Sequence, residues 1–260
     1  MKKWIAMMLT LMLCLALCAC GGRDVGDSKT ESAPTAAPQN EEAAAPDSAA
    51  DAETYPIEEV MAKMEENIPN QEVRDLAAKY LDLTHYENGV LNRSAFLDHV
   101  VASVKVDGVT VEFGISYAEL LALGIEPQDE GYPDMEGVGI PQSGRFLSAD
   151  GNVFEIGIYA DEGVLLRDGS LTYVGSSIFG DTDAAIDLEG ITYGTSFADV
   201  LRILGDPSAL SLGSMYGKGY DGEQGLALEF DTKDGSTYIT IVIDPATETV
   251  GGIDVTSTGV

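Results

Sequence analysis

Apolar residues recur along this chain with two different spacings. Over residues 56–68 and 70–83 they follow the 3.6-residue period of a helix, which predicts two amphipathic helices, the second capped by Asn70. Further along, short apolar runs are divided by Asp-Gly dipeptides, which supply the positive φ angles of tight hairpins and so predict antiparallel strands. The pattern therefore predicts an α+β fold that begins with a short helical pair. Residues 94–104 fit either a helix or a strand.

One stretch of the sequence occurs twice. The segment GISYAELLAL at 114–123 is matched 80 positions later by GTSFADVLRI at 194–203. In each copy a serine, Ser116 or Ser196, can cap a short helix with its hydroxyl. Glu119 completes a capping box in the first copy, where the second copy has a shorter aspartate. We expect each copy to form one short amphipathic helix.

Strand patterns follow each predicted helix and extend the repeat. They cover residues 145–148, 153–160 and 171–179 in the first copy, and 225–231, 238–243 and 251–255 in the second. Each unit is thus predicted to contain one or two strands, a helix and a three-stranded meander. We expect a helical segment over 56–103, a first α+β repeat over 104–183 and a second over 184–260.

The start of the chain resembles a bacterial lipoprotein signal. Two lysines precede an apolar run from residue 4 to residue 19, and Leu17, Ala19 and Cys20 occupy the positions of a lipobox. The resemblance implies removal of residues 1–19 and a diacylglyceryl group on the sulfur of Cys20. The alternatives are a plain signal peptide or a transmembrane anchor, but the run is shorter than the roughly 20 residues that a membrane-spanning helix needs.

Residues 20–55 are rich in Ala, Ser, Pro and acids, and contain almost no large aliphatic side chain. Such a stretch cannot bury enough apolar surface to offset the entropy of ordering. We therefore expect a disordered tether with a reach of roughly 30–35 Å. The 205 residues from 56 to 260 are enough for one large domain or for two small packed units.

Charge and cysteine content exclude several functions. The sequence has 14 Lys and Arg against 44 Asp and Glu, a formal charge of −30. No basic stripe is available for a nucleic-acid backbone, and anionic lipid would repel the chain, so the lipid at Cys20 must supply the membrane anchoring. All three cysteines lie at or before position 20, which excludes a disulfide, a thiol nucleophile or a cysteine zinc site in the exported domain.

The repeated motif resembles units of known protein families. A strand, then Gly-x-Ser/Thr-x-x-Glu/Asp-Val/Leu, a short helix, Gly-x-Pro and a β-meander is similar to the unit of the tandem-repeat β-lactamase inhibitory proteins and of the outer-membrane assembly lipoproteins of the SmpA/OmlA type. The layout of lipobox, acidic linker, DGVTVEFGISYAELLALG and LEGITYGTSFADVLRILGDP resembles lipoproteins of clostridial gut bacteria. The first two resemblances imply a sheet that presents a broad face to another protein, and the third implies no activity. The chain lacks the cysteines that the inhibitory proteins pair.

Few residues suggest catalysis or metal binding. Neither His85 nor His99 has a convincing Ser-His-Asp setting, and the two repeated serines are better explained as helix caps than as nucleophiles. We therefore expect no catalytic residue, no cofactor and no metal site. The densest group of carboxylates lacks the ligand spacing of an EF-hand, and we interpret it as a solvated loop rather than a calcium site; it consists of Asp181, Asp183, Asp187 and Glu189.

Tyrosines in glycine-rich segments are the candidate contact residues. Tyr216 and Tyr220 lie in segment 212–225, and Tyr132 lies in the similar segment 129–137. Tyrosines between glycines can form an adaptable contact surface. An edge strand with a β-bulge is the other explanation of 212–225, and the one that we favour.

These observations favour a lipid-anchored protein on the extracytoplasmic face of the cell membrane. We expect it to act as a non-enzymatic binding or adaptor module for a protein or a cell-envelope component. Capture of a small solute or of calcium for a transporter is an alternative, motivated by the lipid anchor and the acidity. A carboxylate-based hydrolase is a third hypothesis.

Overall fold

The computed structural model describes residues 54–92, 95–176, 183–217 and 219–257. It contains helices and a large antiparallel sheet, so the fold is α+β, as the sequence predicted. The helices of the described residues are α2 (Ile57–Asn67), α3 (Gln71–Tyr80), α4 (Tyr117–Ala122) and α5 (Phe197–Leu204), with the 3-10 turns η1 (Leu83–His85), η2 (Tyr132–Asp134) and η3 (Leu166–Asp168).

The larger sheet has ten strands in the order β1-β2-β10-β11-β12-β13-β8-β7-β6-β5. Its strands are β1 (Tyr86–Glu87), β2 (Val90–Leu91), β5 (Glu126–Pro127), β6 (Gln142–Leu147), β7 (Val153–Tyr159), β8 (Ser170–Gly175), β10 (Ala209–Gly217), β11 (Tyr220–Asp231), β12 (Thr237–Asp244) and β13 (Thr249–Ser257). The last described strand, β13, lies in the interior of the sheet because it pairs with β12 on one side and with β8 on the other.

A second, smaller sheet has the strand order β4-β3-β9. It is formed by β3 (Ser103–Val106), β4 (Val109–Glu112) and β9 (Ile186–Asp187). Asp107 and Gly108, with φ of 49° and 81°, make the tight turn between β3 and β4. The Asp107 carboxylate also accepts hydrogen bonds from Asn152 Nδ2 at 3.0 Å and from the Ala185 N–H at 2.7 Å. This turn therefore ties the small sheet to the β6–β7 turn and to the approach to β9.

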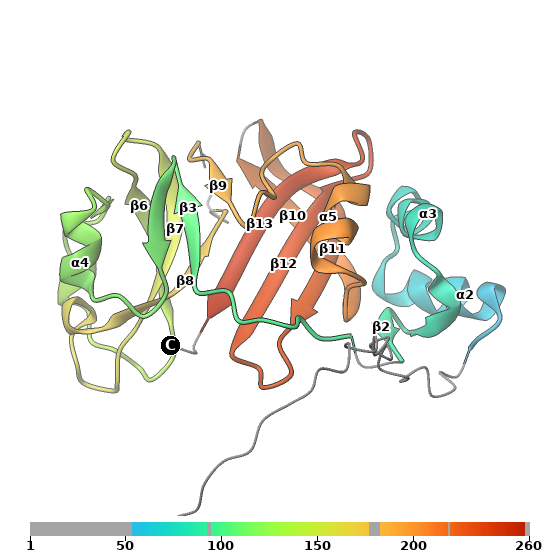
Figure 1. Cartoon of the computed structure of the whole chain (residues 1–260), viewed down its shortest axis with the longest axis horizontal. Coiled ribbons are helices and arrows are strands. Elements are labelled where there is room, and N and C mark those ends of the chain that lie inside the picture. The colour runs from blue at the N-terminus through green and yellow to red at the C-terminus, as the bar shows by residue number, and fades with distance from the viewer. Residues whose placement is uncertain (1–53, 93–94, 177–182, 218, 258–260) are drawn as a thin grey trace, which may run out of the picture. The chain divides into compact units, whose positions relative to one another are not determined.

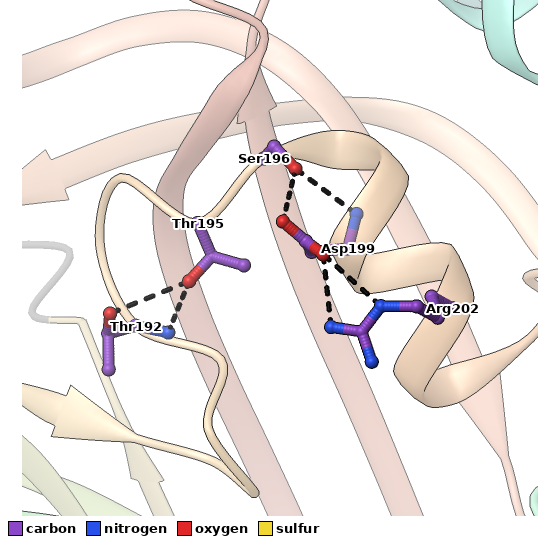
Figure 2. A network of polar contacts seen from close by, with 5 residues as sticks. All are labelled: Thr192, Thr195, Ser196, Asp199 and Arg202. Carbon is purple, nitrogen blue, oxygen red and sulfur yellow. Dashed lines mark hydrogen bonds and ion pairs between the residues drawn. The ribbon is translucent and has the colours of Figure 1, made fainter.

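The two repeated serines cap α4 and α5. Ser116 and Glu119 form a complete capping box, in which the serine hydroxyl accepts from the Glu119 N–H and the carboxylate accepts from the Ser116 N–H. At α5 the Ser196 hydroxyl accepts from the Asp199 N–H at 3.2 Å and donates to the Asp199 carboxylate at 2.7 Å (Figure 2). Arg202 also donates to that carboxylate, at 3.0 Å. The Asp199 carboxylate is therefore held by the side chains of Ser196 and Arg202.

The two faces of the ten-stranded sheet have different surroundings. On one face, Ile239, Ile241 and Ile243 of β12 are fully buried in a core that includes residues of all four α-helices and of the small sheet. Figure 1 shows α5 lying along the strands on this side. The buried apolar cluster of the second face is small, and the sheet alone supplies it: Met215, Ala227 and Val242, with Tyr220 packed against them. Among the described residues, no helix contributes to that cluster.

Three sequence-based expectations need revision. Gly151 and Gly235 have the positive φ expected of Asp-Gly turns, but Gly169 has φ −90° and ends η3 instead. Segment 95–102 forms neither a helix nor a regular strand apart from an isolated bridge between Leu97 and Thr232. The second predicted helix ends at Tyr80 rather than at 83, because a 3-10 turn follows it.

Candidate functional site

A row of polar residues crosses the second face of the ten-stranded sheet. Residues directly opposite each other on neighbouring strands share one face. Across β6, β7, β8, β13, β12 and β11, the opposed residues are Arg145, Glu155, Gly175, Asp254, Thr240 and Glu229. We refer to these six residues as the polar row. On β12, Thr240 alternates with core isoleucines, which fixes the row on the face away from the core.

Asp254 lies near the centre of the polar row, opposite the buried Gly175. A Cβ on Gly175 would overlap both the Asp254 carboxylate and the Tyr173 hydroxyl. That hydroxyl donates a hydrogen bond to Asp254 Oδ1 at 2.7 Å. The tyrosine side chain also lies over Gly157, where a Cβ would come within 2.8 Å of Tyr173 Cβ. Two glycines on adjacent strands therefore give the tyrosine and the carboxylate room to lie close to the sheet.

The surroundings of Asp254 make its charge sensitive to pH. Burial raises the pKa of Asp254 to about 7, the hydrogen bond from Tyr173 opposes this shift, and the negative charge of Glu155 adds to it. Glu155 is itself buried. Burial also raises the pKa of Tyr173, which keeps its hydroxyl protonated as a donor at neutral pH. A carboxyl that titrates near neutral pH can accept hydrogen bonds in both states and can donate one when protonated.

A pair of hydroxyls adjoins the row where β8 ends. The oxygens of Ser176 and Tyr193 lie 2.8 Å apart, and Ser176 Oγ accepts from the Ile253 N–H at 3.0 Å. Burial raises the pKa of Tyr193 to about 12. Tyr193 belongs to the loop before α5, which the Thr192 N–H closes by donating to Thr195 Oγ1 at 2.9 Å (Figure 2). These contacts fix the loop against the β8–β13 junction.

Tyr132, which the sequence suggested as a contact residue, lies in the core. Its side chain is 4% exposed, and its ring meets the edge of Phe146 with centroids 5.2 Å apart. Its hydroxyl donates to the Gln142 carbonyl. The ring also occupies the space above Gly144, where a Cβ would come within 2.5 Å of it. Gly144, which lies outside the segment 129–137, thus makes room for a buried ring, and Tyr132 offers no contact surface.

Tyr216 and Tyr220 lie in the hairpin of β10 and β11 and are half-buried. The pairing register shifts between Met215 and Tyr216, which agrees with the β-bulge favoured from the sequence. The Tyr220 hydroxyl donates to Asp244 Oδ2 at 2.8 Å, and its ring packs against the small cluster around Met215. These two tyrosines lie at the border of the second face rather than in the polar row.

The two predicted non-catalytic histidines lie apart from the polar row. His99 Nδ1 is 2.7 Å from Asp98 Oδ1, and His99 Nε2 is 2.7 Å from Glu189 Oε1. The hydrogen bonds to Asp98 and to Glu189 raise the pKa of His99. His85 Nε2 lies 3.6 Å from a carboxylate oxygen of Asp82. The contacts of His99 join the segment before β3 to the turn after β9.

Two of the four carboxylates considered for calcium, Asp187 and Glu189, have partners within the protein. Asp187 Oδ1 accepts from the Gly190 N–H at 2.7 Å, and Glu189 is bound to His99. Asp181 lies outside the described residues. Over the parts of the chain that the structure describes, no three His, Cys, Asp or Glu side chains are grouped as metal ligands.

Cys20, the predicted site of lipid attachment, lies outside the described residues. In the described ranges, no helix is both long enough and apolar enough to cross a membrane.

The central residues of the polar row were missed from the sequence, although each leaves a local signal. Glu155 stands between Phe154 and Ile156, and Asp254 stands between Ile253 and Val255. An acid inside such an alternating run indicates a strand with one face away from the core. Their common row depends on the pairing of β8 with β13, which local sequence does not indicate.

No protein-family model, curated protein or solved structure matches the chain.

Proposed function

We propose that this protein is a non-enzymatic binding module, held on the extracytoplasmic face of the membrane by lipid at Cys20, that engages a protein partner through the polar row. One observation carries the proposal. The row crosses a sheet face whose small apolar cluster includes no helix residue among the described ranges. Glu155 and Gly175 are buried, but Arg145, Asp254, Thr240 and Glu229 each keep part of their surface in solvent. A sheet face with such partly exposed residues is a platform for a second protein.

The size of this face suits a protein partner. Six strands spaced about 4.8 Å apart span about 24 Å, and seven residues of a strand extend about 24 Å. The face therefore offers about 600 Å², close to the roughly 800 Å² that each partner contributes to a standard interface. Half-buried tyrosines and short side chains on this face would allow close approach of another surface.

We further infer that the chain is built from two tandem units whose last strands meet at the polar row. The Gly114 N–H donates to the Leu171 carbonyl at 2.8 Å, and the Gly194 N–H donates to the Val250 carbonyl at 2.9 Å. In return the Leu171 N–H donates to the Ile115 carbonyl and the Val250 N–H donates to the Thr195 carbonyl, both at 2.9 Å. These matched bonds support treating β8 and β13 as equivalent strands, offset by 79 positions from Leu171 to Val250.

The same offset makes Gly175 equivalent to Asp254, its partner in the antiparallel pair of β8 and β13. In this interpretation the centre of the polar row lies near an internal two-fold axis relating the units. One unit supplies the carboxylate and the other supplies the space into which it fits. A partner on this face would contact both units at once, so the proposed binding function depends on the tandem arrangement.

A photo-crosslinking amino acid placed in the lipidated full-length chain in cells tests the proposal. Placed at Thr240, in the polar row, it should give a discrete adduct with a partner protein. Placed at Ala198, exposed on α5, it should not. The adduct from position 240 should weaken when Glu229 is replaced by lysine in the same chain.

Identical adducts from both positions, or adducts only with abundant neighbours, would contradict binding through this face. In that case, a rise in melting temperature of the full-length chain with calcium or with a small solute would favour capture for a transporter instead.

A further inference from the structure

Exposed apolar side chains concentrate on two segments next to β6 and β7, the strands that carry Arg145 and Glu155 of the polar row. Segments 135–140 and 159–166 run antiparallel, joined by the Gly137 N–H to the Val164 carbonyl at 2.6 Å and by the Leu166 N–H to the Met135 carbonyl at 3.0 Å. We call these two segments the ribbon. It consists of the loop between η2 and β6 and, facing it, the end of β7, the loop that follows and the first residue of η3.

The ribbon carries five of the large apolar side chains that the described residues leave exposed: Met135, Val138, Ile140, Tyr159 and Val164. Ile140, at 62% exposed, and Val138, at 58%, are the two most exposed of these side chains. Single exposed apolar residues are ordinary on a protein surface, but a group of them on one element marks an interaction site.

The exposed charged residues of the ribbon itself are all negative. Glu136, Asp161 and Glu162 are exposed on it. At its border Asp134 is bound to Arg167 at 2.8 Å, so this ion pair adds no net charge. Anionic lipid and a second copy of this acidic chain would both be repelled by such a surface. A cationic partner would be attracted.

A cavity of about 360 Å³ lies beside the ribbon and shows where a cation would fit. Its lining residues include the apolar Ala160 and Val164, the aromatic Tyr159 and the acidic Asp161 and Asp168. A lysine or arginine buries its aliphatic stem against apolar groups while its charged end meets carboxylates. The face of a tyrosine ring is a further favourable contact for that cation.

We propose that the ribbon is a second docking surface, separate from the polar row, for a basic amphipathic segment of a protein. The exposed apolar side chains would contact the apolar residues of that segment. The carboxylates would pair with its lysines or arginines, one of which enters the cavity. The assignment stands independently of binding at the polar row, because it uses other residues and another ligand chemistry.

Binding of defined peptides to the full-length protein in neutral-lipid nanodiscs tests this assignment. The probe is a short fluorescent peptide of alternating lysine and leucine, and the reference is a lysine–glycine peptide of equal charge. Anisotropy should show at least about tenfold tighter binding of the lysine–leucine peptide. Raising salt from about 50 mM to about 500 mM should weaken it. Equal affinity for both peptides would overturn the proposal, because overall charge alone would then explain binding.

Matched variants locate the contact. Removing the apolar side chains (Val138→Ser with Ile140→Ser), or the charges (Asp161→Asn with Glu162→Gln), should each weaken binding at least about tenfold. The control Leu121→Ser removes a comparably exposed apolar side chain of α4 and should leave affinity unchanged. Amide hydrogen exchange should show protection of 135–140 and 159–166 by the peptide. Protection confined to other segments, or equal losses in the control, would overturn the assignment.

Discussion

Replacing Asp254 with asparagine is expected to stabilise the folded chain at neutral and alkaline pH. Burial raises the pKa of this carboxyl from an ordinary 3.8 to about 7. The folded state therefore keeps a proton on Asp254 over a pH range in which the unfolded chain has lost it. The free energy of unfolding consequently falls as pH rises through that range. Asparagine is neutral at every pH and keeps an oxygen that can accept from Tyr173, so the variant should lack this fall.

The size of the effect follows from the shift. A rise of about 3 pKa units, at about 1.36 kcal/mol per unit, gives about 4 kcal/mol as an upper bound. Local relaxation and water reduce such a penalty, so we expect the variant to be more stable at pH 8 by about 1–4 kcal/mol. Below about pH 3 the carboxyl is largely protonated in both states, and the two proteins should have similar stability. Tyr173→Phe removes the hydrogen bond that lowers the pKa of Asp254, so the decrease in the free energy of unfolding should extend to higher pH.

Urea unfolding of the full-length chain, followed by circular dichroism from acidic to alkaline pH, measures this difference. Glu229→Gln is the matched control, because it neutralises another carboxylate of the polar row and leaves Asp254 in place. The control should retain the fall in stability. Parallel pH curves for the wild type and Asp254→Asn, or a fall abolished equally by Glu229→Gln, would refute the reasoning.

Three further predictions concern a glycine, the helix caps and a histidine. Gly175→Ala should lower the free energy of unfolding by about 2–3 kcal/mol, since its Cβ overlaps the carboxylate and hydroxyl above it. The control is Gly131→Ala, whose Cβ would meet one aspartate side-chain oxygen at 3.3 Å; it should lower the free energy of unfolding by less than about 1 kcal/mol. Equal losses in the two variants would argue against close packing at Gly175. In urea unfolding, Ser116→Ala should lower the free energy of unfolding by about 1–2 kcal/mol and Ser196→Ala by about 0.5–1 kcal/mol, because only Ser116 belongs to a complete capping box. A larger loss for Ser196→Ala would contradict this. His99→Gln should lower the melting temperature most below pH 6.5, the ordinary pKa of histidine. Two carboxylates raise the pKa of His99 in the folded chain, so their contribution to stability is complete below pH 6.5 and is lost as pH rises through the raised pKa. A deficit that persisted at high pH would exclude this electrostatic origin.

Features set by neighbours in the sequence could be predicted. The cap at Asn70 forms because its side chain accepts from the N–H two residues on, and the box at Ser116 depends on a glutamate three residues away. The turns at Gly151 and Gly235 follow from the conformational freedom of glycine. Each of these depends on a few consecutive residues, so sequence alone contains the necessary information.

Features set by distant pairing could not be predicted. The small sheet joins Lys105 to Asp187, and the large sheet joins Gly175 to Asp254. Many registers are compatible with the same alternation of apolar and polar residues, and only the packed core selects one. The burial of Tyr132 was also missed, because Gly144, which makes space for its ring, lies in β6, outside the turn that contains Tyr132. The candidate site was therefore visible in the sequence only as isolated acids within strands.

The position of β13 bears on the order in which this protein can be completed during synthesis. Every other described strand is made before β13, yet β13 separates β12 from β8. Until it leaves the ribosome, β12 and β8 each present an unpaired edge, and such edges are templates for aggregation. A chain without β13 thus has two open sheet edges, one on β12 and one on β8. Closure of the large sheet depends on the last described strand to be made.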